Sequence, residues 1–202
     1  MDGRTNARGT SYERFEEREP LRPRAAAVAV ARCVATTARL LARREVRLSR
    51  TRVGLRIRFA DGTTGRVYRE TVVDHPADTD RCVLVVAFRL RAVRGVGHRL
   101  FELESLLNTL LFVGFPGYVS KLWLAADAHG VYRGLYEWDR PALAEAYARA
   151  LWWVLALVSV PGSIHYRVVP GLRRDELLAD PALLERIAPE RSGAWWRVTG
   201  TE

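Results

Sequence analysis

Residues 82–171 contain four strand-like segments, and the first three are apolar or aromatic on both faces. They read CVLVVAFRLRAV (82–93), YVSKLWLAAD (118–127), VYRGLYEW (131–138) and IHYRVVPG (164–171). A strand with water on one side alternates between apolar and polar side chains. These strands do not alternate in that way, so we expect both faces of their sheet to be covered.

Two helical segments separate the strands. Residues 98–117 begin as a helix and must stop before Pro116, which cannot continue one. The second helix runs to about Val158, with Asp139 as its expected cap and Pro141 in its first turn. The order β-α-β-β-α-β predicts an α+β fold of the ferredoxin-like type, with both helices on one face of four antiparallel strands. A second copy of the sheet is the simplest cover for the other face, so we predict a homodimer that closes into a dimeric α+β barrel.

The chain outside this block divides into three further parts. Residues 1–24 are polar and mixed in charge, which predicts a disordered tail. Residues 25–76 predict an extension: a helix over 25–47, from apolar residues at three- and four-residue steps, and a β-hairpin that turns at Asp61–Gly65. The barrel domain is then 77–172, and 173–202 form a C-terminal helix and tail. We expect Trp195-Trp196 to dock on the body of the protein or on a partner subunit; a lid over a substrate is the alternative.

The net charge of +9 does not by itself indicate nucleic-acid binding. Every basic residue except Lys121 is arginine, which is typical of a GC-rich genome, and many arginines lie beside acids. No helix-turn-helix, zinc-finger or RNA-binding signature accompanies them. We therefore expect a solvated basic surface and no nucleic-acid partner.

The motifs that the sequence lacks lead to predictions about the cellular compartment and the cofactors of the protein. Cys33 and Cys82 are far apart and form no CxxC, so we expect two buried free thiols and no metal site. Arginines interrupt the apolar stretch 25–41, and the run 151–160 is too short to cross a bilayer. With no signal peptide at the N-terminus, we predict a cytoplasmic protein without a membrane span. No P-loop, GxGxxG or GxSxG motif points to a nucleotide cofactor or a serine nucleophile.

Residues 115–177 carry a resemblance to a known family. The segments PGYVSKLWL, GVYRGLYEWDRPALAEAYARAL and SIHYRVVPGLRRDEL are similar to the YdhR-like monooxygenases, a branch of the dimeric α+β barrel superfamily. Members of that branch share a Pro-Gly-aromatic step, a lysine before an aliphatic-Trp pair, a glycine in the third strand and a Tyr-containing, Ala-rich second helix. The resemblance extends over about residues 81–177. It implies a pocket between helices and sheet, lined by Asn, Trp and sometimes Tyr, Arg or His, but the superfamily hosts several reactions, so the fold alone selects none.

Three residues are candidates for catalysis. Asn108 lies mid-helix on a stripe with Phe101 and Phe112, which predicts the lining of a cavity; a local hydrogen bond of Asn108 is the alternative. Lys121 is the one lysine of the chain, and burial would lower its pKa and make it a base, an oxyanion stabiliser or a Schiff-base amine. The alternative for Lys121 is an ion pair, for instance with Glu137 across the hairpin. His165 is the best placed histidine for general base catalysis, and a structural role is its alternative.

Aromatic residues along the hairpin are candidates for substrate binding. Tyr132, Tyr136 and Trp138 share one face by the period of two, and Trp123 lies on the neighbouring strand. They could stack on a flat ligand or simply form the core. Haem ligation by His98, His129 or His165 is a further interpretation, which no CxxCH motif supports.

These observations favour a cofactor-independent small-molecule enzyme. We expect a YdhR-like monooxygenase or a cyclase/isomerase of secondary metabolism, acting on an apolar aromatic or enolisable substrate. His165 or Lys121 would remove a proton, and Asn108 would help to hold the oxyanion in a dry site. One alternative is a non-catalytic ligand-binding dimer of the same fold. Another is a basic interaction protein that uses residues 1–60.

Overall fold

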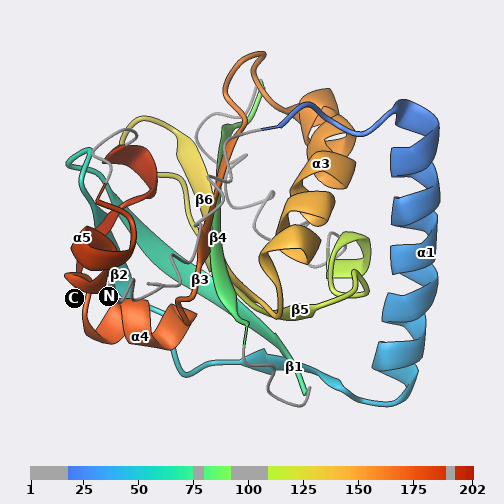
Figure 1. Cartoon of the computed structure of the whole chain (residues 1–202), viewed down its shortest axis with the longest axis horizontal. Coiled ribbons are helices and arrows are strands. Elements are labelled where there is room, and N and C mark those ends of the chain that lie inside the picture. Colours follow the sequence, from blue (N-terminus) through green and yellow to red (C-terminus); the bar gives the residue numbers. More distant parts are fainter. Residues whose placement is uncertain (1–17, 75–79, 92–108, 190–193) are drawn as a thin grey trace, which may run out of the picture.

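The computed structural model describes residues 18–74, 80–91, 109–189 and 194–202. Over these residues the chain forms one curved antiparallel sheet of eight strands with helices on both sides (Figure 1). The strand order is β7-β4-β6-β5-β3-β2-β8, and β1 pairs with β3 beside this path. The strands are β1 (Val46–Ser49), β2 (Arg56–Phe59), β3 (Thr64–Val73), β4 (Cys82–Arg89), β5 (Tyr118–Leu124), β6 (Val131–Trp138), β7 (His165–Pro170) and β8 (Val198–Thr201).

The four strands predicted from the sequence form the ferredoxin-like part of this sheet. Strands β7, β4, β6 and β5 are neighbours in that order, and each pair is antiparallel. In chain order this is fourth, first, third and second, as the βαββαβ pattern requires. Helix α3 (Pro141–Val158) crosses one face (Figure 1). The predicted α+β ferredoxin-like fold is confirmed.

The helix between the first two of these strands was predicted over 98–117. Residues 98–108 of this segment lie outside the described part of the chain. Its end is described: a single 3-10 turn, η1 (Thr109–Leu111), is followed by the bends that lead into β5.

Helix α3 begins differently from the expectation. Its N-cap is Arg140, which makes no side-chain capping hydrogen bond, with Pro141 at the first helical position. Asp139, expected as the cap, instead donates its backbone N–H to the carbonyl of Gly117 and lies buried. The helix thus starts one residue later than a cap at Asp139 would place it.

The N-terminal extension continues the sheet. Strand β3 pairs along β5, and β2 pairs back on β3, so the predicted hairpin is present and adds to the free edge of β5. Helix α1 (Pro23–Ala42) packs beside α3 and η1 at one side of the molecule (Figure 1). The helix was expected to reach residue 47, but it ends earlier because Val46–Ser49 pairs with β3 as β1.

Part of the predicted tail lies against the body of the protein. The backbone N–H of Leu21 donates to Arg149, and the indole N–H of Trp153 donates to the carbonyl of Leu21 at 2.7 Å. Residues 18–22 therefore run along α3 before α1 begins.

The second face of the sheet is covered by the C-terminal part of the same chain. Helices α4 (Arg174–Ala179) and α5 (Leu183–Ile187), the turn η2 (Ala194–Trp196) and β8 lie on the side opposite to α3 (Figure 1). Trp196 is 2% exposed and joins the apolar cluster that includes Leu122, Leu135 and Val169. The double cover predicted from the strands is therefore present, but within one chain. The predicted homodimer stays a prediction, and the outer sheet face through which it was expected to form is covered here by the C-terminal part of the same chain.

One buried ion pair joins this C-terminal cover to the sheet, and a second lies within the sheet. Arg174 of α4 pairs with Glu70 of β3 at 2.9 Å, and both side chains are almost fully buried. Arg81, just before β4, pairs with Glu137 of β6. Each of these four buried charges thus has an opposite charge beside it, which offsets the cost of its burial.

In the part of the chain that the structure describes, two helices, α1 and α3, are long and apolar enough to cross a membrane when length and composition alone are considered. Such helices are weak evidence of a membrane span, because the core helix of a folded domain passes the same test. Helix α3 buries Ala144, Tyr147 and Leu151 against the sheet.

Candidate functional site

Lys121 lies inside a group of aromatic rings on the α3 face of the sheet. Its Nζ atom is 3.3 Å from the ring centroid of Trp123, 4.3 Å from that of Phe112 and 4.6 Å from that of Tyr136. The residue is 6% exposed. We call Lys121 and these three residues the Lys121 cluster. The structure thus brings one predicted catalytic residue together with three predicted binding residues.

The strand register places the cluster on one face. Lys121 of β5 is the cross-strand partner of Tyr136 on β6, and Trp123 is the partner of Gly134. Side chains that are directly opposite in an antiparallel pair project to the same face. Phe112 joins the cluster from the loop before β5, with its ring centroid 4.9 Å from that of Trp123.

Glycine at position 134 makes room for this arrangement. A Cβ atom at Gly134 would lie 2.5 Å from the Tyr136 ring and 3.1 Å from Cε of Lys121. The first distance is far inside van der Waals contact, so a side chain here would displace the ring or the lysine. This close contact explains why glycine occupies this position of the third strand. The same glycine is one of the features behind the family resemblance.

Lys121 does not pair with Glu137, which was the alternative interpretation. Glu137 is the cross-strand partner of Ser120, so it projects to the opposite face, where it pairs with Arg81. Within the described residues no carboxylate lies within ion-pair distance of Lys121. A positive charge does act on Lys121: that of Arg69, whose guanidinium carbon lies 3.7 Å from the Trp123 ring centroid.

Burial lowers the pKa of the Lys121 amine well below its usual range, and the positive charge of Arg69 lowers it further. Contact with aromatic rings favours the charged amine, but by only about 2 kcal/mol. Removing an ammonium ion from water costs several kcal/mol, which is the larger effect. The amine is thus held toward its neutral form, in which it can accept a proton or attack an electrophile.

A second tyrosine, Tyr147, is hydrogen-bonded to Tyr136 of the cluster. The hydroxyl of Tyr147, on α3, donates to the hydroxyl of Tyr136 at 3.0 Å. Burial raises the pKa of both phenols, so both stay protonated at neutral pH. Sequence analysis did not select Tyr147 as a site residue. The feature of the sequence that could have indicated Tyr147 is its place as a tyrosine in the Ala-rich helix of the segment that carries the resemblance.

Hydrogen bonds hold Trp123 in place. Its indole N–H donates to the hydroxyl of Thr71 at 3.1 Å, and Thr71 is the cross-strand partner of Lys121 on β3. The β3 strand of the extension therefore positions a ring of the cluster, a role that the sequence did not indicate.

Two further predicted binding residues lie on the same face but outside the cluster. Trp138 is fully buried and packs on Tyr147, with ring centroids 4.8 Å apart. Tyr132 stacks on Phe88 at 5.8 Å, toward the other end of β6. Trp138 thus extends the aromatic core beneath α3, and a role in the core was the alternative interpretation for these residues.

His165 lies away from Lys121. It is exposed, and its ring centroid is 5.8 Å from that of Trp195, on the C-terminal side of the sheet. Its neighbour Tyr166 projects to the α3 face and is buried there. The two bases named from the sequence therefore lie on opposite faces of the sheet and cannot act on the same atom.

Asn108 and Phe101, the remaining predicted site residues, lie outside the described part of the chain. Within that part, no group of three or more His, Cys, Asp or Glu residues could hold a metal ion. Cys33 and Cys82 are buried thiols, as predicted, and burial raises the pKa of both.

Comparisons with known proteins show a similarity to solved structures in the fold alone. No family model matches the chain, and no curated protein is similar to it. Among solved structures, a ferredoxin-fold protein related to antibiotic biosynthesis monooxygenases from Listeria monocytogenes is 15% identical, with a TM-score of 0.41, over 55% of this chain and 66% of the other. A monooxygenase-like protein from Listeria innocua is 15% identical, with a TM-score of 0.40, over 56% of this chain and 66% of the other. An anthrone oxidase-like protein is 13% identical, with a TM-score of 0.36, over 55% of both chains.

The matches therefore leave about a third or more of each neighbour uncovered. The strand order and register, and not these similarities, define the fold. The protein is an α+β protein with a ferredoxin-like core, whose sheet is extended at one edge and covered on both faces by its own chain.

Proposed function

We propose that the protein is a small-molecule enzyme that binds an apolar aromatic or enolisable substrate beside the Lys121 cluster. The observation that carries this proposal is a buried lysine surrounded by three aromatic rings, without a carboxylate partner among the described residues. Aromatic faces offer a large contact area to a flat ligand. A neutral amine among them is a base in a dry environment.

The proposed reaction starts with proton transfer to Lys121. A substrate with an acidic C–H next to a carbonyl group would lose this proton to Nζ and become an enolate. The ammonium ion that forms is in contact with the faces of Trp123, Phe112 and Tyr136, which stabilise a cation. The positive charge of Arg69 favours the negative enolate, because opposite charges attract strongly in a site that excludes water.

The enolate can continue in two ways. In a cofactor-independent oxygenation, a CH₂ carbon gives electrons to dioxygen; one oxygen atom becomes a new carbonyl and the other leaves as water with the two protons. In a cyclisation or isomerisation, the enolate carbon forms a new bond or takes back a proton at another position, and no oxygen is consumed. The family resemblance favours the first. A homodimer, a cytoplasmic location and a role in secondary metabolism remain parts of this proposal that rest on the sequence.

Anthrone is a suitable probe, because it is a flat tricyclic ketone with an acidic methylene group. Oxygen uptake and anthraquinone formation would be followed with the wild-type protein, Lys121→Met and His165→Gln. Methionine keeps the length and apolar stem of lysine but cannot accept a proton. We expect K121M to lower the turnover rate on the order of 100-fold or more, the usual contribution of a general base. H165Q should keep the wild-type rate, because His165 lies on the other face.

Equal losses in the two variants, or full activity of K121M, would contradict the role of Lys121. Binding of anthrone, seen as quenching of tryptophan fluorescence, without turnover would replace the enzyme by the ligand-binding alternative.

A further inference from the structure

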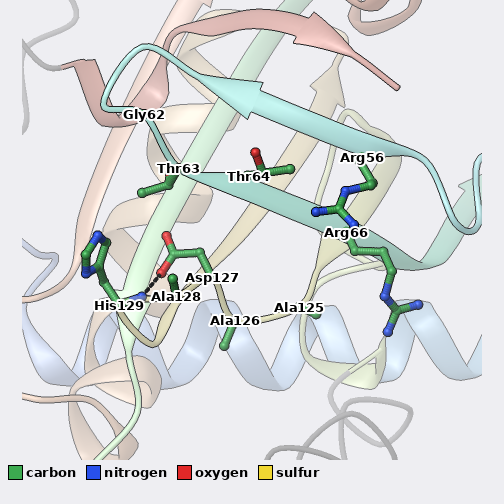
Figure 2. Close-up of a pocket in the computed structure, with 10 residues that line it drawn as sticks. All are labelled: Arg56, Gly62, Thr63, Thr64, Arg66, Ala125, Ala126, Asp127, Ala128 and His129. Atoms are coloured by element: carbon green, nitrogen blue, oxygen red, sulfur yellow. Dashed lines mark hydrogen bonds between the residues drawn. The ribbon is translucent and has the colours of Figure 1, made fainter.

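A polar groove lies at the end of the sheet where the β2–β3 and β5–β6 hairpins turn. Its volume is about 570 Å³, within the range of small-molecule sites. Arg56 of β2 and Arg66 of β3 line one end, and His129, in the turn after β5, lies at the other (Figure 2). Residues 125–128 run between them, and Thr64 lines the β3 side.

The two arginines are direct cross-strand partners. Like charges that are directly opposite on a β-ladder destabilise it. Neither Arg56 nor Arg66 forms an ion pair with any residue that the structure describes, and both are exposed. An anion between the two guanidinium groups would remove this repulsion.

The carboxylates near the groove are engaged by other arginines. Asp127 pairs with Arg133 at 2.5 Å and accepts the backbone N–H groups of His129 and Val131. These contacts hold the pKa of Asp127 below its usual range, although burial opposes them. Asp61 pairs with the same Arg133 at 2.7 Å. The two acids carry two negative charges and Arg133 carries one positive charge, so one negative charge remains at the end of the groove where Asp127 lies.

The C-terminal strand supplies one more acid at this edge. Glu202 is hydrogen-bonded through its backbone to Arg56, but its side-chain carboxylate lies 3.4 Å from Arg58. Arg56 and Arg66 are left without an acidic partner among the described residues. Their two positive charges outweigh the one negative charge that remains near Asp127, so the groove is net positive, and its positive charge is concentrated at one end.

We propose that this groove binds a small organic phosphate monoester. The phosphate would lie between Arg56 and Arg66, because a guanidinium group offers two parallel N–H donors that match phosphate oxygens. The organic part would extend along residues 125–128 toward His129. A groove of about 570 Å³ exceeds what a phosphate ion alone would fill. This site is independent of the Lys121 cluster, so neither proposal rests on the other.

Binding would be measured by isothermal titration calorimetry with the full chain, at low salt, using phenyl phosphate as the probe and benzoate as the carboxylate control. The test variant is Arg56→Gln/Arg66→Gln. The matched control is Arg24→Gln/Arg186→Gln, which removes the same charge from two other exposed arginines that lack ion pairs. We expect the Kd for phenyl phosphate to rise at least tenfold in R56Q/R66Q and to stay within twofold in R24Q/R186Q. Benzoate should bind more weakly than phenyl phosphate.

Three results would overturn the proposal: no binding of phenyl phosphate by the wild type at millimolar concentration, equal losses in both double variants, or benzoate binding as tightly as phenyl phosphate. A single-stranded oligonucleotide that binds much more tightly than phenyl phosphate, through the same two arginines, would replace the small ligand by a nucleic acid. Such binding would fall steeply as salt rises.

Discussion

The Nζ atom of Lys121 lies 3.3 Å from the centre of the Trp123 ring, two residues further along the same strand. A lysine in this position would ordinarily reach solvent or a carboxylate, but here it is enclosed by aromatic side chains and repelled by Arg69. The amine therefore contributes to stability in a way that depends on pH, and this dependence can be measured without knowing the substrate.

The first prediction concerns the pH dependence of stability. The folded pKa of Lys121 lies well below the usual 10.5, so between these values the unfolded chain binds a proton that the folded protein does not. The contribution of Lys121 to folding is fully present above the unfolded pKa and is lost as pH falls toward the depressed folded pKa. The wild type should thus gain stability relative to K121M as pH rises from 7 to 10, by up to about 1.4 kcal/mol per pH unit.

This difference would be obtained from urea unfolding of both proteins at each pH. Other titrating groups cancel in the comparison, because the two proteins share them. A difference that stays constant from pH 7 to 10 would show that Lys121 has an ordinary pKa.

The second prediction concerns Gly134. Alanine at this position would place a Cβ atom 2.5 Å from the Tyr136 ring, so we expect G134A to lower the free energy of unfolding by about 1–3 kcal/mol. Thermal and urea unfolding would measure the loss. In a Tyr136→Leu background the same substitution should cost clearly less, since the clashing ring is gone. Equal costs in the two backgrounds would show that the ring does not constrain position 134.

The third prediction concerns the C-terminal cover. Trp196 is 2% exposed in the cluster on the outer face of the sheet, whereas Trp195 is only partly buried. Replacement of Trp196 by alanine should cost about 3–5 kcal/mol, as for other large buried aromatic residues. W195A should cost less.

Loss of the cover would also expose apolar strands, so W196A should self-associate more than the wild type. Unfolding curves and light scattering at matched concentrations would test both effects. A wild type that is dimeric while W196A is monomeric would instead place Trp196 in a subunit interface.

The fourth prediction concerns the buried pair Arg174–Glu70, which joins α4 to β3 at 2.9 Å. Arg174→Met leaves the buried Glu70 carboxylate without its cation, and we expect a loss of about 3–5 kcal/mol. The double variant R174M/E70M removes both charges and should recover most of this loss. A double-mutant cycle by urea unfolding would give the coupling between them, and additive losses would show that the two charges do not interact.

Much of the fold could be predicted from the sequence because its signals are local. The turn at Ala128-His129-Gly130 and the two-residue period fixed the limits of β6 and the shared face of Tyr132, Tyr136 and Trp138. Pro141 fixed the start of α3 within one or two residues, since proline is favoured in the first turn. The order of these elements then determined the ferredoxin-like core.

The tertiary structure decided what no local signal carries. The Lys121–Glu137 pairing expected as an alternative was wrong by one residue of register, and one residue moves a side chain to the opposite face. Apolar residues on both faces of the strands indicated that the outer sheet face is buried, but burial by the C-terminal part of the same chain and burial by a second subunit give the same pattern. The lowered pKa of Lys121 results from its burial among side chains of β5, β6 and the loop at Phe112, and from the positive charge of Arg69 on β3. Sequence determines which residues can be buried, whereas the fold determines which of them meet, because those contacts join positions far apart along the chain.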